Sequence, residues 1–226
     1  MANSDFLRRN KNQHSIKNTI SKKMDKEIDI AIGRTVAYLG KKYPDLSFNH
    51  RKTLHLAEIV SIVSRQYPQH AHLFSSVMKS SFIRPDGGFL SASNRNEEQK
   101  IILVAEVKHQ GTNDKRLKEG LKKQARGNAI ERLGKNLTAV RAMFKRDGII
   151  PFVCFGNGDD FKDESTIRDR VVTMNDFFPL NTSFVRKEYL PFEPVSMFFR
   201  YAKWDVNEIT KIMVGVAEEA IRYYFR

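Results

Sequence analysis

The sequence predicts an α/β fold in which a mixed central β-sheet is flanked by helices. Short apolar runs rich in β-branched residues, typical of buried strands, are interspersed with longer segments whose apolar residues recur every three or four positions, as in amphipathic helices. Helices come first and are followed by strands with interspersed helices, an order that favours a mixed sheet. At 226 residues, 41% of them hydrophobic, the chain is long enough to bury the core of one such domain.

The first part of the chain is predicted to be mainly helical. Met1–His14 is polar and basic, and we expect an arm that becomes ordered only on binding a partner, followed by a single domain over residues 15–226. Ser15–Tyr43 has helical apolar spacing and is followed by a proline, which ends helices. Ser47–His50 is expected to be extended, and Thr53–Gln66 repeats the helical pattern before another proline.

A pair of strands is predicted in the middle of the chain. Ser81–Leu90 and the apolar run Ile101–Gln110 are a hairpin-like pair that can meet across the polar turn Ser91–Lys100. The basic segment Lys115–Arg146 then has helical spacing. A break is expected near Gly127, because a glycine costs up to about 1 kcal/mol in a helix interior.

The last third of the chain is predicted to add strands and a closing helix. Strands are expected where apolar and β-branched residues cluster, at Pro151–Phe155, Val171–Met174, Ser183–Arg186 and Ser196–Tyr201. Val206–Phe225 has one apolar stripe and is predicted to be a helix. Asp205 and Glu208 at its start resemble a capping box, in which two side chains satisfy free backbone N–H groups.

The charge balance indicates a polyanionic partner. Lys and Arg residues number 39 against 26 Asp and Glu, so the formal net charge is +13 and the pI is about 9.8. A balance this basic favours nucleic acid over a membrane surface. The arm Arg8–Lys23 and the run Lys115–Arg126, including Lys122 and Lys123, are candidates for phosphate contacts. The alternative is that these lysines are merely solvated.

Cysteine usage and hydropathy exclude several classes of protein. Cys154 is the single cysteine, so an intrachain disulfide and a cysteine-based zinc cluster are excluded. Because it lies in an apolar run, it is interpreted as a buried, inert thiol. No apolar run approaches the ~20 residues that span a bilayer, and the basic N-terminus lacks the apolar region of a secretory signal. We therefore expect a cytoplasmic protein.

Charged residues interrupt the second strand of the central pair. Glu106 and Lys108 are two residues apart, so in a strand both side chains point to one face. Charged groups on an apolar strand are costly unless they are paired or bind something. If Phe82–Leu90 pairs with this strand, Asp86 reaches the same point. The alternative is a surface ion pair between Glu106 and Lys108, with His109 a polar neighbour rather than a metal ligand.

Two carboxylates and a lysine at one point would form a divalent-metal site for phosphodiester hydrolysis. Mg²⁺ prefers hard oxygen ligands and keeps several waters, so Asp86 and Glu106 would suffice to hold it. Lys108 would stabilise charge on the phosphate or orient the attacking water. Gly87 and Gly88, which lack side chains, would let a DNA backbone approach Asp86.

Three motifs in this order resemble the EcoRI family of type II restriction endonucleases. They are Arg84-Pro-Asp-Gly-Gly88, Val104-Ala-Glu-Val-Lys-His-Gln-Gly111 and Gly127-Asn-Ala-Ile-Glu-Arg132. Looser similarity extends to Asn136 and Pro151–Phe155. The resemblance implies a PD-(D/E)XK nuclease core, a homodimer that requires Mg²⁺, and double-stranded DNA as substrate. It further implies cleavage at a short palindrome to leave 5′-phosphates and 5′ overhangs, with a cognate methyltransferase protecting host DNA.

The resemblance also implies roles for single residues. Asp86, Glu106 and Lys108 match the catalytic triplet, the two carboxylates being the metal ligands. Asn128 and Arg132 match side chains that contact the adenines of an AATT centre, which agrees with the bidentate bonding of Asn to adenine. Gly127 and Ala129 match residues whose backbone contacts the AATT centre. Glu131 matches a carboxylate that orients the arginines. From the residues alone, an ordinary capped helix start is the alternative.

Arg126 bears on the outermost base pair. The family has Ala at this position, whereas the related MunI-type enzymes, which read C and G outside AATT, are similar here. We hypothesise that Arg126 contacts the outer guanine and favours CAATTG over GAATTC. A contact to phosphate, which carries no sequence information, is the alternative.

Two other functions remain open at this point. A structure-specific DNA repair nuclease of the same superfamily would cut without a defined sequence. A non-catalytic DNA-binding protein would keep the fold without needing Asp86, Glu106 and Lys108. The intact triplet therefore favours the restriction endonuclease.

Overall fold

A five-stranded sheet forms the centre of the molecule. The computed structural model describes residues 26–75, 78, 80–95, 99–109, 119–120, 128–189 and 191–225. The strands in sheet order are β1 (Ser47–Arg51), β4 (Gly88–Ser93), β5 (Lys100–His109), β6 (Phe152–Asn157) and β7 (Ser196–Arg200). The pairs β1–β4 and β4–β5 are antiparallel, whereas β5–β6 and β6–β7 are parallel. The predicted mixed sheet is confirmed.

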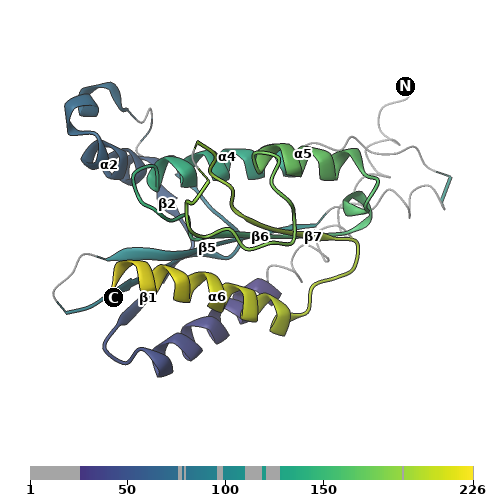
Figure 1. The fold of residues 1–226 in the computed structure, drawn as a ribbon, viewed down its shortest axis with the longest axis horizontal. Coiled ribbons are helices and arrows are strands. Elements are labelled where there is room, and N and C mark those ends of the chain that lie inside the picture. The colour runs from purple at the N-terminus through teal and green to yellow at the C-terminus, as the bar shows by residue number, and fades with distance from the viewer. Residues whose placement is uncertain are drawn as a thin grey trace, which may run out of the picture.

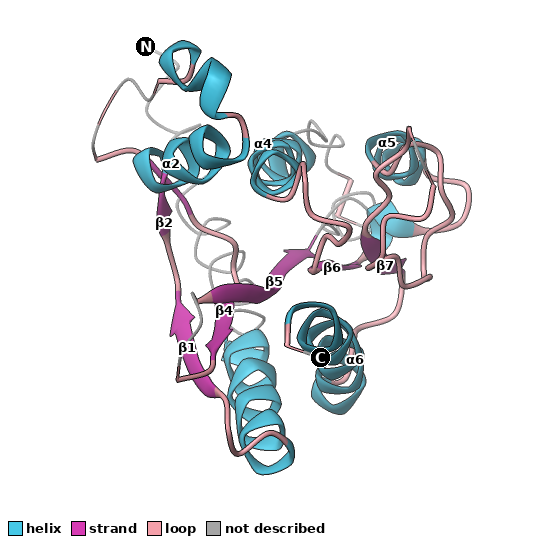
Figure 2. Cartoon of the chain, turned by 60° about the vertical axis from the view of Figure 1, so that its left-hand side comes forward, coloured by secondary structure: helices cyan, strands magenta, loops and turns pink. Residues whose placement is uncertain are grey.

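Helices cover both faces of this sheet (Figure 1). A helix over residues 26–42 and α6 (Val206–Tyr224) lie on one face, and α2 (Leu56–Gln66), α4 (Asn128–Met143) and α5 (Thr166–Met174) lie on the other. Figure 2 shows the same three layers from a second direction. Two short 3₁₀ helices, η1 (Pro68–Leu73) and η2 (Asp159–Phe161), follow α2 and β6. Within the described ranges, no helix combines the length and apolar character needed to cross a membrane.

Each face of the sheet has its own hydrophobic core, because successive side chains of a strand point to opposite faces. Val153 and Phe155 of β6 pack with the helix over residues 26–42 and with α6. Phe152 and Cys154 pack on the other side, with α4 and α5. Cys154 is a free, fully buried thiol whose pKa is raised by burial, as predicted.

The predicted strand Ser81–Leu90 is wrong as a single element. Its first part forms β3 (Phe82–Ile83), which pairs with β2 (Leu54–His55) in a separate two-stranded sheet. The chain then bends through residues 84–87, and β4 begins only at Gly88, whose φ is +75°. The run Pro-Asp-Gly-Gly is typical of a turn, so this bend was readable in the sequence.

The predicted helix boundaries need smaller corrections. The helix expected over Thr53–Gln66 begins at Leu56, because β2 precedes it. In the long basic segment, Glu119 and Gly120 form a turn, and α4 ends at Met143 rather than Arg146. The helix predicted from Ser15 is seen from residue 26 to 42, and the arm Met1–His14 lies outside the described residues.

Two of the short strands predicted late in the chain are wrong. Val171–Met174 lies in α5, where Ile167 and Val171 are buried one turn apart and the Ser165 side chain caps the helix start. A four-residue β-branched run cannot be distinguished from part of a helix by periodicity. Ser183–Arg186 forms only an isolated bridge between Ile149 and Arg186. The capping box predicted at Asp205 and Glu208 is confirmed.

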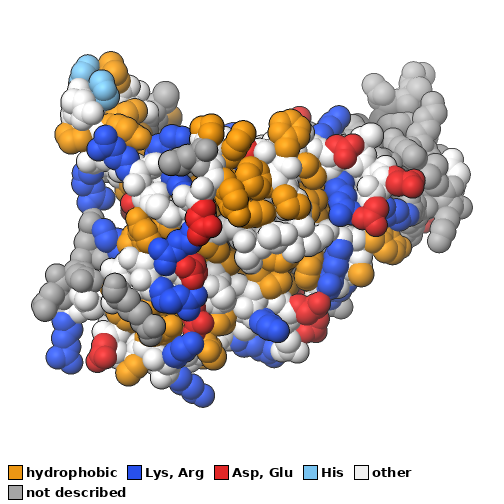
Figure 3. Space-filling view, in the orientation of Figure 1, with side chains coloured by type: hydrophobic (Ala, Val, Ile, Leu, Met, Phe, Trp, Pro, Cys, Tyr) orange, Lys and Arg blue, Asp and Glu red, His pale blue; other side chains and the backbone are white. Residues whose placement is uncertain are grey.

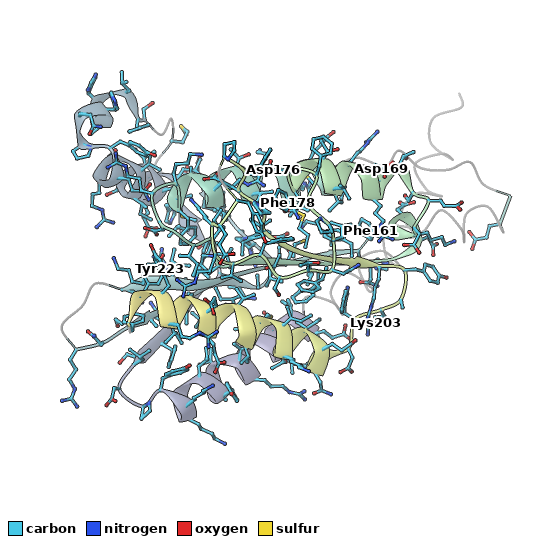
Figure 4. All side chains as sticks on the ribbon, viewed as in Figure 1. Phe161, Asp169, Asp176, Phe178, Lys203 and Tyr223 are labelled. Atoms are coloured by element: carbon cyan, nitrogen blue, oxygen red, sulfur yellow. The ribbon has the colours of Figure 1, made fainter. Side chains whose placement is uncertain are left out.

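The segment after α5 lies over α4. The Asp176 carboxylate accepts a hydrogen bond from Arg141 of α4 at 3.1 Å, and Asp176 and Phe178 are labelled in front of this helix in Figure 4. In Figure 3, hydrophobic side chains gather in the middle of this face. The exposed aromatic residues of the segment include Phe177, Tyr189 and Phe192. Arg141, in the last turn of α4, thus ties this segment to the helix.

Two glycine substitutions are expected to have opposite effects on stability, because one glycine lies at the close approach of β6 and β7 and the other has open space around it. A Cβ at Gly156 would lie 2.2 Å from the Phe199 ring, which is fully buried and packed edge-on against Phe161. We expect Gly156→Ala to lower the free energy of unfolding by ~1–3 kcal/mol, the usual cost of overpacking. Gly33→Ala, in a helix with open space around Cβ, should raise it by ~0.5–1 kcal/mol. Urea unfolding of both variants measures this, and equal midpoints would contradict the packing argument.

Candidate active site

Three predicted residues meet at the junction of β4 and β5. Glu106 and Lys108 lie near the end of β5, and Asp86 lies in the bend immediately before β4. Lys108 Nζ lies 3.1 Å from Asp86 Oδ2 and also donates to Glu106 Oε1. The backbone N–H of Asp86 lies 3.3 Å from Glu106 Oε2. The structure therefore brings the two carboxylates to one ammonium group. Alternation along the strand predicted the shared face of Glu106 and Lys108, and the expected strand pairing predicted that Asp86 would join them.

Glu106 is the most buried member of this group. Its side chain is 1% exposed, against 12% for Lys108 and 34% for Asp86. Burial raises the pKa of the Glu106 carboxyl to about 7; the Lys108 ammonium opposes this shift and Asp86 adds to it. Burial lowers the pKa of Lys108, but the two carboxylates outweigh it and the net shift is upward. The site therefore combines a desolvated carboxylate with a firmly protonated lysine.

The bend that carries Asp86 is held by contacts from the end of β1 and the residue that follows it. His50 Nε2 donates to the Gly87 carbonyl at 2.8 Å, and Lys52 Nζ donates to the Asp86 carbonyl at 3.0 Å. The Gly87 N–H donates to the Ala105 carbonyl of β5 at 2.9 Å. Sequence reasoning missed His50 and Lys52. Their two-residue spacing at the end of an extended segment is a weak signal that both point the same way.

The two glycines after Asp86 are explained by packing within the chain. A Cβ at Gly87 would lie 2.7 Å from Ala105 Cβ, and a Cβ at Gly88 would lie 2.5 Å from the Arg51 carbonyl oxygen. Gly88 also has φ +75°, which other residues rarely adopt. Both glycines are thus needed for Asp86 to reach β5, independently of any DNA.

A further contact to Glu106 comes from the helix layer. Asn136 of α4 donates from Nδ2 to Glu106 Oε2 at 3.1 Å. Sequence reasoning noted Asn136 only as a point of looser similarity and assigned it no role. Its contact with a residue 30 positions away depends on how α4 packs on the sheet, which no local pattern indicates.

His109 lies next to the triplet at the end of β5. Burial lowers the pKa of its imidazole, while hydrogen bonding with Asn157 opposes the shift. Among the described residues, no group of three or more His, Cys, Asp or Glu side chains is arranged to hold a metal ion.

Comparison with known proteins identifies the family. The sequence model described as restriction endonuclease EcoRI matches residues 10–168, more than half of the chain. The chain belongs to the EcoRI family. The type II restriction enzyme EcoRI of Escherichia coli is 27% identical over 237 residues, which cover 86% of this chain and 84% of EcoRI. The type II restriction enzyme RsrI of Cereibacter sphaeroides is 25% identical over 243 residues, covering 92% and 87% of the two chains.

Membership in the EcoRI family gives the site its reaction class. The protein is a type II restriction endonuclease, a site-specific deoxyribonuclease, and its substrate is DNA. Members of the family typically depend on Mg²⁺. The residues present fit that ion, because the Asp86 and Glu106 carboxylates both face the Lys108 ammonium and so converge where a cation is favoured. Mg²⁺ needs only one or two carboxylates, since it keeps much of its water shell.

The residues predicted to read DNA lie at the start of α4 or before it. Glu131 and Arg132 are exposed in the first turns of this helix, and Asn128 and Ala129 are described only as positions of its backbone. The remaining predicted contacts lie outside the described residues; these are Arg126, Gly127, Lys115, Lys122 and Lys123. Of the predicted DNA contacts, the structure thus describes the side chains of Glu131 and Arg132.

The close approach at Gly88 yields a prediction for the Asp86 bend. Gly88→Ala should destabilise the protein by more than the ~1–2 kcal/mol that a left-handed conformation costs a residue with a Cβ, because the methyl group also meets the Arg51 carbonyl. Gly120→Ala is a matched control, with a similar φ of +68° and no atom of the described residues within 4 Å of its Cβ. Urea unfolding would measure both. A Gly88 variant no less stable than the Gly120 variant would contradict the steric argument.

Proposed function

We propose that this member of the EcoRI family cuts both strands of a short palindrome with an AATT centre, in a Mg²⁺-dependent reaction that leaves 5′-phosphates and 5′ overhangs. The candidate sites are CAATTG and GAATTC. The observation that carries the proposal is the convergence of Asp86, Glu106 and Lys108 at the β4–β5 junction. A protein that only bound DNA would not need a buried carboxylate beside a second carboxylate and a lysine.

The two carboxylates and the lysine have different roles in the proposed reaction. Asp86 and Glu106 hold the metal ion, which when bound polarises a phosphate oxygen and favours ionisation of water. Lys108 carries a fixed positive charge to the same point, where it stabilises negative charge developing on the phosphate. Water oxygen bonds to phosphorus and the bond from phosphorus to the 3′ oxygen breaks. The attacking water gives up a proton to the solvent, and the leaving 3′ oxygen takes up a proton to become a 3′-hydroxyl. The other product is a 5′-phosphate.

The start of α4 would read the AATT centre. Asn128 and Arg132 would contact adenines, Gly127 and Ala129 would approach the bases through their backbone, and Glu131 would orient the arginines. Exposure of Glu131 and Arg132 in the first turns of α4 supports this assignment. Arg126, immediately before this segment, would contact the guanine of the outer base pair.

The proposed partners follow from the symmetry of the substrate. A palindrome has a twofold axis, so a homodimer can place one active site on each strand. A cognate methyltransferase would be required to protect the same sequence in host DNA. Basic residues before α4, among them Lys115, Lys122 and Lys123, would contact phosphates, and such contacts predict that binding weakens steeply with salt.

Digestion of a sequenced plasmid tests the proposed function directly. With Mg²⁺ we expect discrete fragments whose ends map to AATT-centred palindromes, and no cleavage with Ca²⁺ or EDTA. Glu106→Gln should reduce cleavage by ~10²-fold or more, because a metal ligand is lost. It should keep or tighten specific binding in Ca²⁺, because one negative charge facing the phosphate is removed.

Other outcomes of the digestion would point to other functions. Metal-dependent cutting without a sequence preference would indicate a repair nuclease, and sequence-selective binding without cutting would indicate a DNA-binding protein. Loss of binding in Glu106→Gln would make Glu106 a structural residue.

The outer base pair is tested by comparing two duplexes that differ only there. Wild type should cut CAATTG faster than GAATTC, and Arg126→Ala should reduce this preference by ~10-fold, since a good contact to guanine contributes about 1–3 kcal/mol. The rate constants would be measured at saturating enzyme. An unchanged preference in Arg126→Ala, with weaker binding to both duplexes, would make Arg126 a phosphate contact.

A further inference from the structure

The amide of Asn136 joins the helix layer to the buried carboxylate of the site. Asn136 is half-buried in α4, and its Nδ2 lies 3.1 Å from Glu106 Oε2. Within the described part of the chain, the other hydrogen bonds to this carboxylate come from Lys108 Nζ and from the Asp86 N–H at 3.3 Å. Asn136 thus brings to Glu106 a contact from a helix, whereas the other two donors belong to β5 and to the bend before β4.

The two oxygens of Glu106 are held differently. Lys108 fixes Oε1 through a charge-assisted contact, whereas Oε2 is held by two neutral donors, of which Asn136 is the closer. A buried carboxylate is costly unless its oxygens are hydrogen-bonded. Without Asn136, the remaining contact to Oε2 is the longer one from Asp86. The orientation of the carboxylate plane therefore depends on the Asn136 amide.

The position of Asn136 within α4 links it to the proposed DNA contacts. Asn136 follows Arg132 by four residues and Asn128 by eight, so these positions fall on successive turns along one side of the helix. The distance from residue 128 to residue 136 is about 12 Å along the axis. Leu133 and Leu137 on the adjoining stripe are buried in the core beneath α4. The start of α4 and Asn136 thus belong to one helix that is anchored to the sheet through these leucines.

We propose that Asn136 is a positioning residue that makes the geometry of Glu106 depend on how the start of α4 is seated on DNA. With α4 in its seated position, the amide holds Oε2 and the carboxylate is oriented for catalysis. A site with a wrong base pair seats the helix differently and loses this hydrogen bond. The proposal rests on the proposed function, because it assumes that the start of α4 reads bases and that Glu106 acts in cleavage.

Cleavage by full-length Asn136 variants tests the positioning role. We expect single-turnover cleavage of the AATT-centred duplex at saturating enzyme to slow ~10–100-fold in Asn136→Ala, the usual effect of losing a partner of a ligand. Binding in Ca²⁺ should stay within about threefold of wild type, since the ordering of a ligand rather than a DNA contact is lost. Asn136→Asp, which has nearly the same shape but no N–H donor, should slow cleavage at least as much as Asn136→Ala. Thr138→Ala, an exposed polar-to-alanine change on α4, should leave rate and binding unchanged.

The variants also distinguish other roles for Asn136. Wild-type activity in Asn136→Asp would make the contact one of packing and overturn the proposal. Weakened binding with an unchanged rate at saturation would make Asn136 a phosphate contact.

The coupling to recognition is tested with a duplex altered at one outer base pair. On the altered duplex, Asn136→Ala should slow cleavage by a several-fold smaller factor than on the preferred site. An equal slowing on both duplexes would overturn the coupling.

A measurement without DNA or metal separates this inference from the proposed function. Urea unfolding midpoints of Asn136→Ala, Glu106→Ala and the double variant should be non-additive, because contacting residues couple. As a control, Thr138→Ala should shift the midpoint by the same amount in the wild type and in Glu106→Ala. Additive midpoints for Asn136 and Glu106 would overturn the contact itself. Failure of wild type to cut at AATT sites would instead remove the proposed function, whatever the unfolding experiment gives.

Discussion

The burial of the Glu106 carboxylate is the constraint on which the arrangement of the site depends. A carboxylate that is 1% exposed is strongly destabilising unless donors surround it. Here the donors come from three separate elements: Lys108 in β5, the Asp86 N–H before β4, and Asn136 in α4. Each element must therefore be in place for the carboxylate to be tolerated. The upward shift of the Glu106 pKa has the same cause, which is the burial of the carboxyl group.

The change of strand direction within the sheet determines where this group can form. β5 has an antiparallel neighbour, β4, on one side and a parallel neighbour, β6, on the other. The antiparallel neighbour starts where β5 is about to end, so the bend before β4 delivers Asp86 beside Glu106. Glu106 and Lys108 point to the α4 side of the sheet, away from the core that contains Val107. In an EcoRI-family endonuclease, this arrangement puts the residues of the proposed chemistry and the helix with the proposed base contacts on the same side of the sheet.

Much of the fold could be predicted, because long periodic segments carry their own signal. The closing helix with its Asp205 and Glu208 capping box, the buried strand around Cys154 and the extended segment after Pro44 were all readable. Short apolar runs were not, and Val171–Met174 belongs to a helix that buries Ile167 and Val171 one turn apart. The split of the predicted strand Ser81–Leu90 has a different cause. Its residues Phe82 and Ile83 pair with β2, a partner nearly 30 positions away, and local alternation carries no information about partners.

For the site, the sequence by itself predicted which residues would carry the proposed chemistry. The two-residue spacing of Glu106 and Lys108 required a shared face, and the motifs around Asp86 and Asn128 were enough to indicate the EcoRI family. The tertiary structure decided how that chemistry is held. His50, Lys52 and Asn136 contact the site from residues 30 to 37 positions away, and the burial of Glu106 exists only once α4 covers the sheet. Local spacing sets the direction in which a side chain points, whereas only the packing of distant segments sets what that side chain meets.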